Sequence, residues 1–164
     1  PMKNLTVAFD WQRVFYSDIR AVGNPIENLA STEGFLGENG GAGFGWQDQD
    51  IYKIGIKYKL NPEWDVQIGY NYAEAPMPDD QLLFSAIAPA VTDKHLTLGA
   101  TYRQSQNMEW TVAYVHAFNN KEKGVANSGG QFDQFFPNED LTGPGDMEIQ
   151  MVQDSLELMF TYKL

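Results

Sequence analysis

The residue types that carry most protein chemistry are scarce in this chain and are not grouped. The two histidines, His95 and His116, fall on opposite faces of the alternating segments that contain them, so they cannot form a metal pair from neighbouring positions of one strand. Ser105 and Ser155 lack companion histidine and aspartate residues in any arrangement that a sequence reveals. Cysteine is absent, which excludes disulfides and thiolate metal sites. We therefore predict no catalytic residue, no metal and no cofactor, and expect that the protein is not an enzyme.

Acidic residues form two short clusters that could hold a divalent cation. One cluster is Asp79-Asp80, and the other is Glu139-Asp140 with Asp146. Carboxylates are the oxygen ligands that Ca²⁺ and Mg²⁺ accept, but solvated charge in exposed loops explains the same residues more simply. The glycine-rich run 37–45 lacks the lysine and the helix of a phosphate-binding loop, so it is expected to be an ordinary loop.

A more suggestive feature is a set of apolar residues within otherwise polar segments. They are Leu82, Leu83, Phe84 and Ile87, and separately Phe132, Phe135 and Phe136. Apolar clusters in exposed segments usually mark either binding or packing. Two interpretations therefore stay open: these residues pack the loops over one another as a lid, or they capture an apolar ligand.

Three cations form the other candidate set for ligand binding. Lys53, Lys57 and Arg103 all belong to the polar face of alternating segments described below. A carboxylate head group is a natural partner for such cations. An internal salt network would explain the same residues equally well.

Composition excludes several classes of function. The 164 residues include 22 Asp and Glu against 11 Lys and Arg, giving a formal net charge of −11, which argues against binding to nucleic acid. No run of about 18 apolar residues exists, so no transmembrane helix can be drawn. The opening residues, Pro1-Met2-Lys3-Asn4, lack the apolar core of a secretory signal, so an exported chain would be a mature or truncated piece.

Six segments alternate between apolar and polar residues with a period of two, which is typical of strands whose faces meet different environments. They cover about 4–12, 52–60, 64–72, 95–103, 109–118 and 155–164. The clearest is 64–72, where Trp64, Val66 and Ile68 alternate with Asp65 and Gln67. The chain is therefore predicted to be all-β and to form a single portion of a larger structure over residues 1–164.

The connections between these segments alternate between short and long. Asn61-Pro62-Glu63 and Ser105-Gln106-Asn107 are compact turns, whereas the other links run over about 17–43, 74–93 and 119–146. Such long links are uncommon in compact soluble domains but ordinary in outer-membrane barrels, which have short periplasmic turns and long extracellular loops. The same parity places Leu164 on the periplasmic side.

Aromatic residues on the apolar face gather at the two ends of the segments. The periplasmic set is Tyr58, Trp64, Tyr102, Trp110 and Tyr162, and the outer set is Phe15, Tyr52, Tyr70, Tyr72 and Phe118. Two such girdles indicate the interfaces of a membrane, because these rings have an apolar body and, in Tyr and Trp, a polar tip. Eight residues of strand, about 27 Å long and tilted by about 40°, span about 20 Å, close to the ~25 Å apolar band of such barrels. Arg13 and His116 share this face but lie near the outer interface.

Six strands are too few to close a membrane barrel, since barrels of this class start at about eight strands. An open edge in lipid would leave backbone groups unpaired. We expect that the chain lacks N-terminal strands, with association of other copies or fragments as the alternative.

Several motifs resemble the long-chain fatty-acid transporter family of outer-membrane proteins, the FadL/TodX group. They are Ile51-Tyr52-Lys53-Ile54-Gly55-Ile56, Asn61-Pro62-Glu63-Trp64, Ile68-Gly69-Tyr70, Ala75-Pro76-Met77-Pro78, Ile87-Ala88-Pro89 and Leu96-Thr97-Leu98-Gly99-Ala100-Thr101-Tyr102. The resemblance covers most of the chain from about Asp50 onward and implies a barrel of about fourteen strands with an N-terminal hatch. The end, Phe160-Thr161-Tyr162-Lys163-Leu164, resembles the signal that barrel-assembly machinery reads, although that signal usually ends in Phe.

The resulting hypothesis is passive uptake of hydrophobic compounds, such as long-chain fatty acids, across the outer membrane of a Gram-negative bacterium. Its partners would be the hydrophobic small molecule, the lipid of the outer membrane and, during biogenesis, the assembly machinery. A general porin or a purely structural barrel is the first alternative. A soluble β-sandwich binding module is the second, because its strands also alternate.

Overall fold

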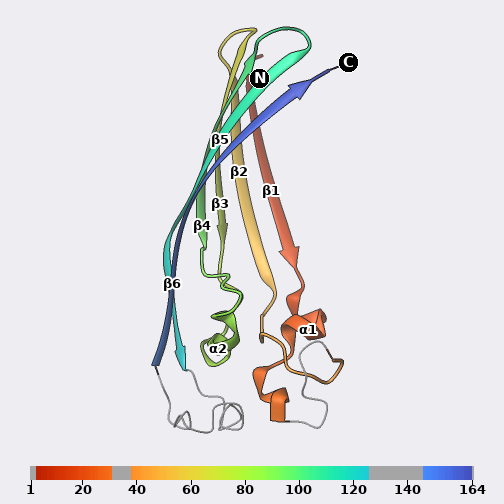
Figure 1. Ribbon diagram of the computed structural model, residues 1–164, viewed down its shortest axis with the longest axis vertical. Coiled ribbons are helices and arrows are strands. Elements are labelled where there is room, and N and C mark those ends of the chain that lie inside the picture. The colour runs from red at the N-terminus through yellow and green to blue at the C-terminus, as the bar shows by residue number, and fades with distance from the viewer. Residues whose placement is uncertain (1–2, 31–37, 126–145, 164) are drawn as a thin grey trace.

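The computed structural model describes residues 3–30, 38–125 and 146–163, and its six strands form one sheet. Each strand pairs antiparallel with the next strand in the sequence (Figure 1). The strands are β1 (Leu5–Val14), β2 (Gln49–Lys59), β3 (Trp64–Ala73), β4 (Lys94–Arg103), β5 (Met108–Val125) and β6 (Asp146–Tyr162). The predicted antiparallel up-and-down sheet is therefore confirmed. The outer edges of β1 and β6 pair with no other strand among the described residues, so closure by further strands stays a prediction.

The register of the strands collects the apolar residues on one face of the sheet, which we call the outward face. Directly opposed residues of an antiparallel pair lie on the same face, so a row of partners can be followed across all six strands. One such row is Val7, Ile56, Ile68, Leu98, Tyr114 and Leu156. The neighbouring row on the inward face is Ala8, Gly55, Gly69, Thr97, Val115 and Ser155. Pairing therefore aligns the alternating residues of the six strands, so that one face of the sheet is apolar and the other is polar or lined by small residues.

The outward face is not covered by a second layer of the described structure. Leu158 is 73% exposed, and Trp64 and Tyr70 are 39% and 40% exposed. A β-sandwich would bury these side chains between two sheets, as the soluble alternative requires. Most of the buried apolar residues belong instead to the connections at one end of the sheet. The described fold therefore does not fit the sandwich interpretation.

The two short turns lie at the same end of the sheet as the start of β1 and the end of β6 (Figure 1). The carboxamide oxygen of Asn61 accepts hydrogen bonds from the backbone N–H groups of Glu63 and Trp64, at 2.9 and 2.8 Å, which closes the first turn. In the second turn the backbone N–H of Asn107 donates to the Ser105 hydroxyl at 3.3 Å. Asn and Ser provide such local bonds readily, and this explains why both turns are compact.

An aromatic row crosses the outward face beside these turns. Trp64 lies opposite Tyr102, Tyr102 opposite Trp110, and Trp110 opposite Phe160. The rings of Trp64 and Tyr102 stack with centroids 4.8 Å apart, and those of Trp110 and Phe160 are 4.6 Å apart. The predicted members Tyr58 and Tyr162 sit one step to either side of this row. Phe160 was not predicted as a member, and it completes the row on β6.

At the opposite end of the sheet the long connections contain short helices. These are η1 (Tyr16–Asp18), α1 (Arg20–Gly23), η2 (Ile26–Ala30), η3 (Asp79–Gln81) and α2 (Leu82–Ser85). None of the described helices is long and apolar enough to cross a membrane. We call segments 15–30, 38–48 and 74–93 the lid. Its apolar side chains form two clusters that contain most of the buried apolar residues of the described chain.

Strands β5 and β6 extend further than predicted, because their alternation changes sign partway along. The expected connection 119–146 begins only after Val125, since β5 continues past an irregularity between Ala117 and Asn120. Beyond this point the apolar residues of β6 are Met147, Ile149 and Met151, and they pack inward against the lid. Outward positions there carry Lys121 and Glu148, which form an ion pair at 2.8 Å. The outward face thus changes from apolar to charged along one continuous strand pair, which is what passage from hydrocarbon to water requires.

A polar group on the outward face lies just before this change. His116 Nδ1 and the Tyr114 hydroxyl lie 2.7 and 2.5 Å from one carboxylate oxygen of Asp154. His116 was predicted near the outer interface, whereas Asp154 was missed because the last strand was expected to begin at position 155. The carboxylate is accepted on this face because it has two polar partners beside it.

The two faces can be tested by placing a lysine on each. Leu98 lies on the outward face midway between the levels of Trp64 and Tyr72, whereas its neighbour Thr97 faces inward. We expect Leu98→Lys to lower the free energy of unfolding from lipid bilayers by about 2–4 kcal/mol, and Thr97→Lys to change it much less. Urea titration of folding into vesicles measures both variants. Equal losses would contradict the assignment of the faces.

Candidate functional site

An inner charge cluster occupies the inward face near the turns, and its centre is Asp65 on β3. The Asp65 side chain is almost completely buried, although Asp65 belongs to a strand whose other face is open. The guanidinium of Arg103, from β4, donates two hydrogen bonds to the two carboxylate oxygens of Asp65, one of them at 3.2 Å. Lys57 Nζ, from β2, lies 2.9 Å from the same carboxylate. The neighbouring strands therefore place two cations against one buried anion.

The cluster continues across β5 to the end of β6. Arg103 Nε lies 3.6 Å from Glu109, and Glu109 also pairs with Lys163. Of the predicted ligand-binding cations, Lys57 and Arg103 thus belong to one salt network. Lys53 lies apart from it and contacts Asp10 at 3.5 Å and Gln12 at 3.0 Å. Ligand binding by these cations stays a prediction, and a ligand would have to compete with the acids that hold them.

A lumenal hollow adjoins this cluster in the middle of the inward face. Its volume is about 320 Å³. It is lined by Thr6, Ala8, Gly55, Ile56, Lys57, Gln67, Ile68, Gly69, Thr97, Gly99 and Ala113. Small residues create this space, since an added Cβ at Gly55 would meet nothing within 4 Å. At Gly99 the space is used already, because Gln67 Oε1 lies 2.7 Å from where a Cβ would stand. The hollow therefore combines a mostly small, uncharged wall with one cation, Lys57, at its edge.

The predicted apolar ligand residues are placed in or next to the lid clusters. Leu82 is 1% exposed and packs with Met77 and Val91, whereas Phe84 packs with Ile26 and Ala42 in the second cluster. Leu83 is half-buried against that second cluster, and Ile87 is 77% exposed. Phe132, Phe135 and Phe136 lie outside the described residues. Packing as a lid therefore accounts for Leu82 and Phe84 in this structure, and Ile87 alone of the described four is largely open to solvent.

A buried glutamine, which was not predicted, joins lid segment 74–93 to lid segment 15–30. Gln81 is 6% exposed, and its carboxamide oxygen accepts the backbone N–H of Ile26 at 2.8 Å. Its amide nitrogen donates to both carboxylate oxygens of Glu27, at 3.1 and 3.0 Å. One side chain therefore satisfies polar groups at the start of η2 from a segment more than fifty residues away.

Gly45 makes room for this contact. Its φ of +64° lies in the region that favours glycine, and an added Cβ would stand 2.4 Å from Gln81 Cγ. Next to it, Trp46 Nε1 donates to the Ser85 hydroxyl at 3.2 Å. Segments 38–48 and 74–93 are thus in contact at the end of η3 and at the end of α2. The glutamine signal was absent from the sequence because an isolated Gln in a polar loop has no distinguishing pattern.

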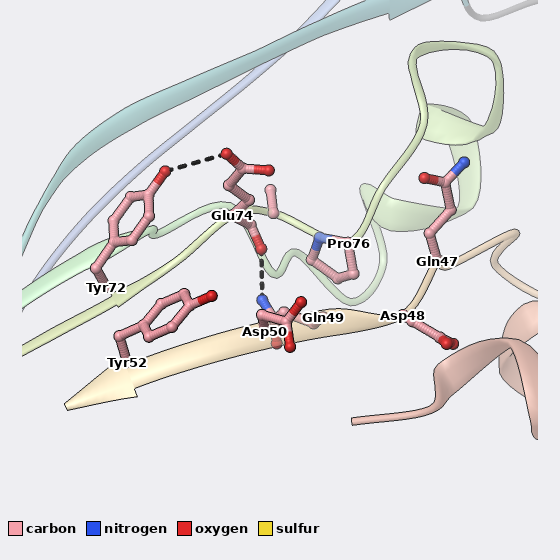
Figure 2. A pocket seen from close by; sticks show the side chains of 9 residues that line it. Gln47, Asp48, Gln49, Asp50, Tyr52, Tyr72, Glu74 and Pro76 are labelled. Atoms are coloured by element: carbon pink, nitrogen blue, oxygen red, sulfur yellow. Dashed lines mark hydrogen bonds between the residues drawn. The ribbon is translucent and has the colours of Figure 1, made fainter. Parts of the chain in front are cut away.

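A pocket, which we call the rim pocket, opens beside the lid, where the pairing of β2 and β3 ends. It has a volume of about 250 Å³ and is lined by Gln47, Asp48, Gln49, Asp50, Tyr52, Tyr72, Glu74, Ala75 and Pro76. The pairing of β2 and β3 ends at Ile51 and Ala73. The two segments meet again where the backbone N–H of Gln47 donates to the Pro76 carbonyl at 2.8 Å. Figure 2 shows the pocket between these two connections, with the rings of Tyr52 and Tyr72 on one side. None of these residues was predicted as a site.

The carboxylates of the rim pocket differ in how well they are paired. Asp48 accepts hydrogen bonds from the Ser17 hydroxyl at 2.7 Å and from the Ser17 backbone N–H, and the hydroxyl bond holds the pKa of the Asp48 carboxyl below its usual range. Asp50 accepts from Trp11 Nε1 at 3.1 Å and from Arg13 at 3.2 Å. The Glu74 carboxylate accepts one hydrogen bond among the described residues, from the Tyr72 hydroxyl at 3.2 Å (Figure 2).

The described residues include no group of three His, Cys, Asp or Glu side chains that could hold a metal ion. Asp79 and Asp80 lie in η3 and are exposed. The other acidic cluster, Glu139-Asp140 with the side chain of Asp146, lies outside the described residues. The chemistry of the described chain is therefore that of hydrogen bonds, ion pairs and apolar surface.

The contact between lid segments 15–30 and 74–93 can be tested at Gln81. Gln81→Ala removes three hydrogen bonds and leaves the Ile26 N–H without its partner, so we expect a local loss of about 2 kcal/mol. Hydrogen exchange of residues 20–30 should rise by roughly 30-fold, since about 1.4 kcal/mol corresponds to a factor of ten. Gln150→Ala, in β6, is the matched control. Unchanged exchange in the Gln81 variant would show that the lid does not depend on this side chain.

Comparison with known proteins agrees with this fold. A model of the family described as outer membrane protein transport protein (OMPP1/FadL/TodX) matches residues 1–151. Among solved structures the chain is similar to the toluene transporter TodX of Pseudomonas putida and to a FadL homologue of Pseudomonas aeruginosa, each with a TM-score of 0.57 and 16% sequence identity. A comparison with curated protein sequences gives no significant match.

The structural matches cover 98% of this chain but 31% and 32% of the two solved chains. The chain therefore spans about a third of the length of those structures. The family match extends over most of the chain, and it confirms the resemblance drawn from the motifs. This chain belongs to the FadL/TodX family of outer-membrane transport proteins and is located in the outer membrane.

Proposed function

We propose that the protein takes up hydrophobic compounds across the outer membrane by binding and diffusion, without nucleotide or metal chemistry. The observation that carries this proposal is the contrast between the two faces of one sheet. The outward face offers a continuous apolar surface to lipid, while the inward face holds a hollow with an apolar wall. A path for an apolar solute along the inward face needs such a wall, because fully charged walls would favour water and ions.

We propose long-chain fatty acids as the preferred cargo. The hollow is large and mostly uncharged, and Lys57 stands at its edge with 49% of its side chain exposed. An alkyl chain fits the small-residue wall, and a carboxylate head group fits an exposed ammonium. The similar structure from Pseudomonas putida is named a toluene transporter, so aromatic hydrocarbons are the competing cargo class.

Two partners follow from the same proposal. The outward face between the aromatic rows would contact the lipid of the outer membrane. The last residues of β6, with Phe160 and Tyr162 on the outward face, would be read by barrel-assembly machinery during insertion.

The cargo proposal can be tested with the protein expressed from its own gene and reconstituted in liposomes. Lys57→Gln should weaken binding of a long-chain fatty acid about three- to tenfold, because it removes the cation at the hollow. Lys59→Gln is the matched control, since Lys59 shares the strand and the face but does not line the hollow. Binding is measured by displacement of a fluorescent fatty acid, and folding by heat-modifiable mobility.

Other results would point elsewhere. Sugar or ion flux without fatty-acid binding would favour the general porin and contradict the proposal. Binding of toluene that is insensitive to Lys57→Gln, with no binding of fatty acids, would retain uptake of hydrophobic compounds but change the cargo class.

A further inference from the structure

Gln67, on β3, has the longest uncharged side chain among the residues that line the lumenal hollow. Its partner on β2 is Lys57, and its partner on β4 is Gly99. Directly opposed residues share a face, so these three residues stand in one inward row. The next inward row toward the lid passes through Gly55 and Gly69. Gln67 therefore stands between the cation of the hollow and its uncharged wall.

The Gln67 side chain lies over Gly99. A Cβ at position 99 would stand 2.7 Å from Gln67 Oε1 and 3.7 Å from Gln67 Cβ and Cδ. The carboxamide thus takes the place that a side chain on β4 would fill. Glycine weakens the interior of a strand, and one found there often marks a close approach of another group. Here Gly99 allows Gln67 to lie along the wall of the sheet.

Contact with this wall is what holds Gln67 in place. Within residues 3–30, 38–125 and 146–163, no hydrogen bond or ion pair involves the Gln67 side chain. Its neighbour Lys57 differs, because an ion pair of 2.9 Å ties it to Asp65. A half-buried side chain without such bonds changes rotamer easily. The carboxamide is therefore the movable polar group at the edge of the hollow.

The space that could receive this carboxamide lies over the next inward row. A Cβ at Gly55 would meet nothing within 4 Å, and a Cβ at Gly69 would have its nearest neighbours at 3.7 Å. Toward the turns, the buried Asp65 and its ion-pair partners fill the inward face. A Gln67 side chain displaced from Gly99 would therefore turn into the hollow. Its three terminal heavy atoms, at up to about 30 Å³ each, the liquid volume of a water molecule, would fill up to roughly a quarter of it.

We propose that Gln67 determines the width of the hollow, and that the hollow admits carboxylic acids branched beside the carboxyl group. This proposal rests on the proposed function, in which Lys57 meets the carboxylate of a cargo. The first carbons of that cargo would then lie over Gly55 and Gly69. The hollow, at about 320 Å³, is roughly twice the size of an engineered cavity that holds benzene. A second alkyl branch therefore has room while Gln67 stays over Gly99.

The test compares two isomeric acids on the protein expressed from its own gene and reconstituted in liposomes. Palmitic acid is unbranched, and α-hexyldecanoic acid has the same formula with a branch beside the carboxyl group. The readout is the ratio of their affinities, measured by displacement of a fluorescent fatty acid. We expect the unaltered protein to bind both acids.

Gly99→Ala should shift this ratio about tenfold toward palmitic acid, because misfit by as little as one methylene in an apolar site has at least this effect. The added methyl group meets the far end of a flexible side chain, so β4 can keep its fold. Adding Gln67→Ala to Gly99→Ala should restore the ratio, since no long side chain then remains to enter the hollow. Gln67→Ala alone should shift the ratio toward the branched acid.

Ser155→Thr is the matched control. It also adds one methyl group to the inward face, at the level of Gly55, but it lies on β6 outside the lining of the hollow. The ratio should stay unchanged in this variant. Heat-modifiable mobility reports folding of every variant.

Three results would overturn the proposal. They are no binding of the branched acid by the unaltered protein, equal weakening of both acids by Gly99→Ala, and a shifted ratio that Gln67→Ala does not restore. If Gly99→Ala does not fold, an unshifted ratio in Gln67→Ala alone would overturn the proposal equally. Failure of the unaltered protein to bind palmitic acid is a different result, because it contradicts the proposed cargo, and this inference falls with it.

Discussion

Backbone hydrogen bonding in hydrocarbon is the constraint on which the rest of this structure depends. A peptide group in lipid has no water to bond, so every strand inside the membrane must find its partners in its neighbours. The antiparallel ladder that results has one register for each pair, and the register decides which side chains share a row. A slip by one residue between β3 and β4 would place Thr97 beside Ile68 and move charge into the lipid. The apolar face and the inward polar face are therefore two results of one set of bonds.

At the end of the sheet beside the lid, water replaces hydrocarbon as the solvent, and the apolar residues of β5 and β6 change face there. Past the irregularity in β5, Met147 and Ile149 turn inward to the lid while Lys121 and Glu148 turn outward. Hydrophobic burial resumes there because water is now the solvent that apolar groups avoid. The lid accordingly has what the sheet lacks, namely a packed apolar core, and the buried side chain of Gln81 is hydrogen-bonded beside it. One chain thus folds in both hydrocarbon and water, and the boundary between the two media lies where the apolar residues of β6 change from the outward to the inward face.

How far the sequence predicts this molecule follows from the same physics. Period-two alternation and turn residues such as Asn61 are local signals, so the six strands, both turns and the face of Trp64 were predicted correctly. The reversal at Met147 to Met151 was also present in the sequence, but it was missed because only the longer runs of alternation were counted. Gln81 and Asp65 could not be singled out, since their importance comes from residues far away in sequence that the fold brings to them. Ligand binding by Leu82, Lys57 and Arg103 stays a prediction, because a sequence pattern does not show whether a side chain is already packed or ion-paired in the fold.

Charge placement also bears on how the inward face could serve the proposed apolar cargo. Lys57 and Arg103 would make a strongly hydrated wall if they stood alone, but Asp65 and Glu109 gather them beside the turns. Pairing concentrates the charge near one end and leaves the row through Gly55 and Gly69 uncharged. An ion pair inside a barrel adds little net stability when its partners are partly exposed, so its main effect here is spatial. Fewer charges therefore stand in the middle of the wall, and a solute without charge would meet the least competition from water at the level of Gly55 and Gly69.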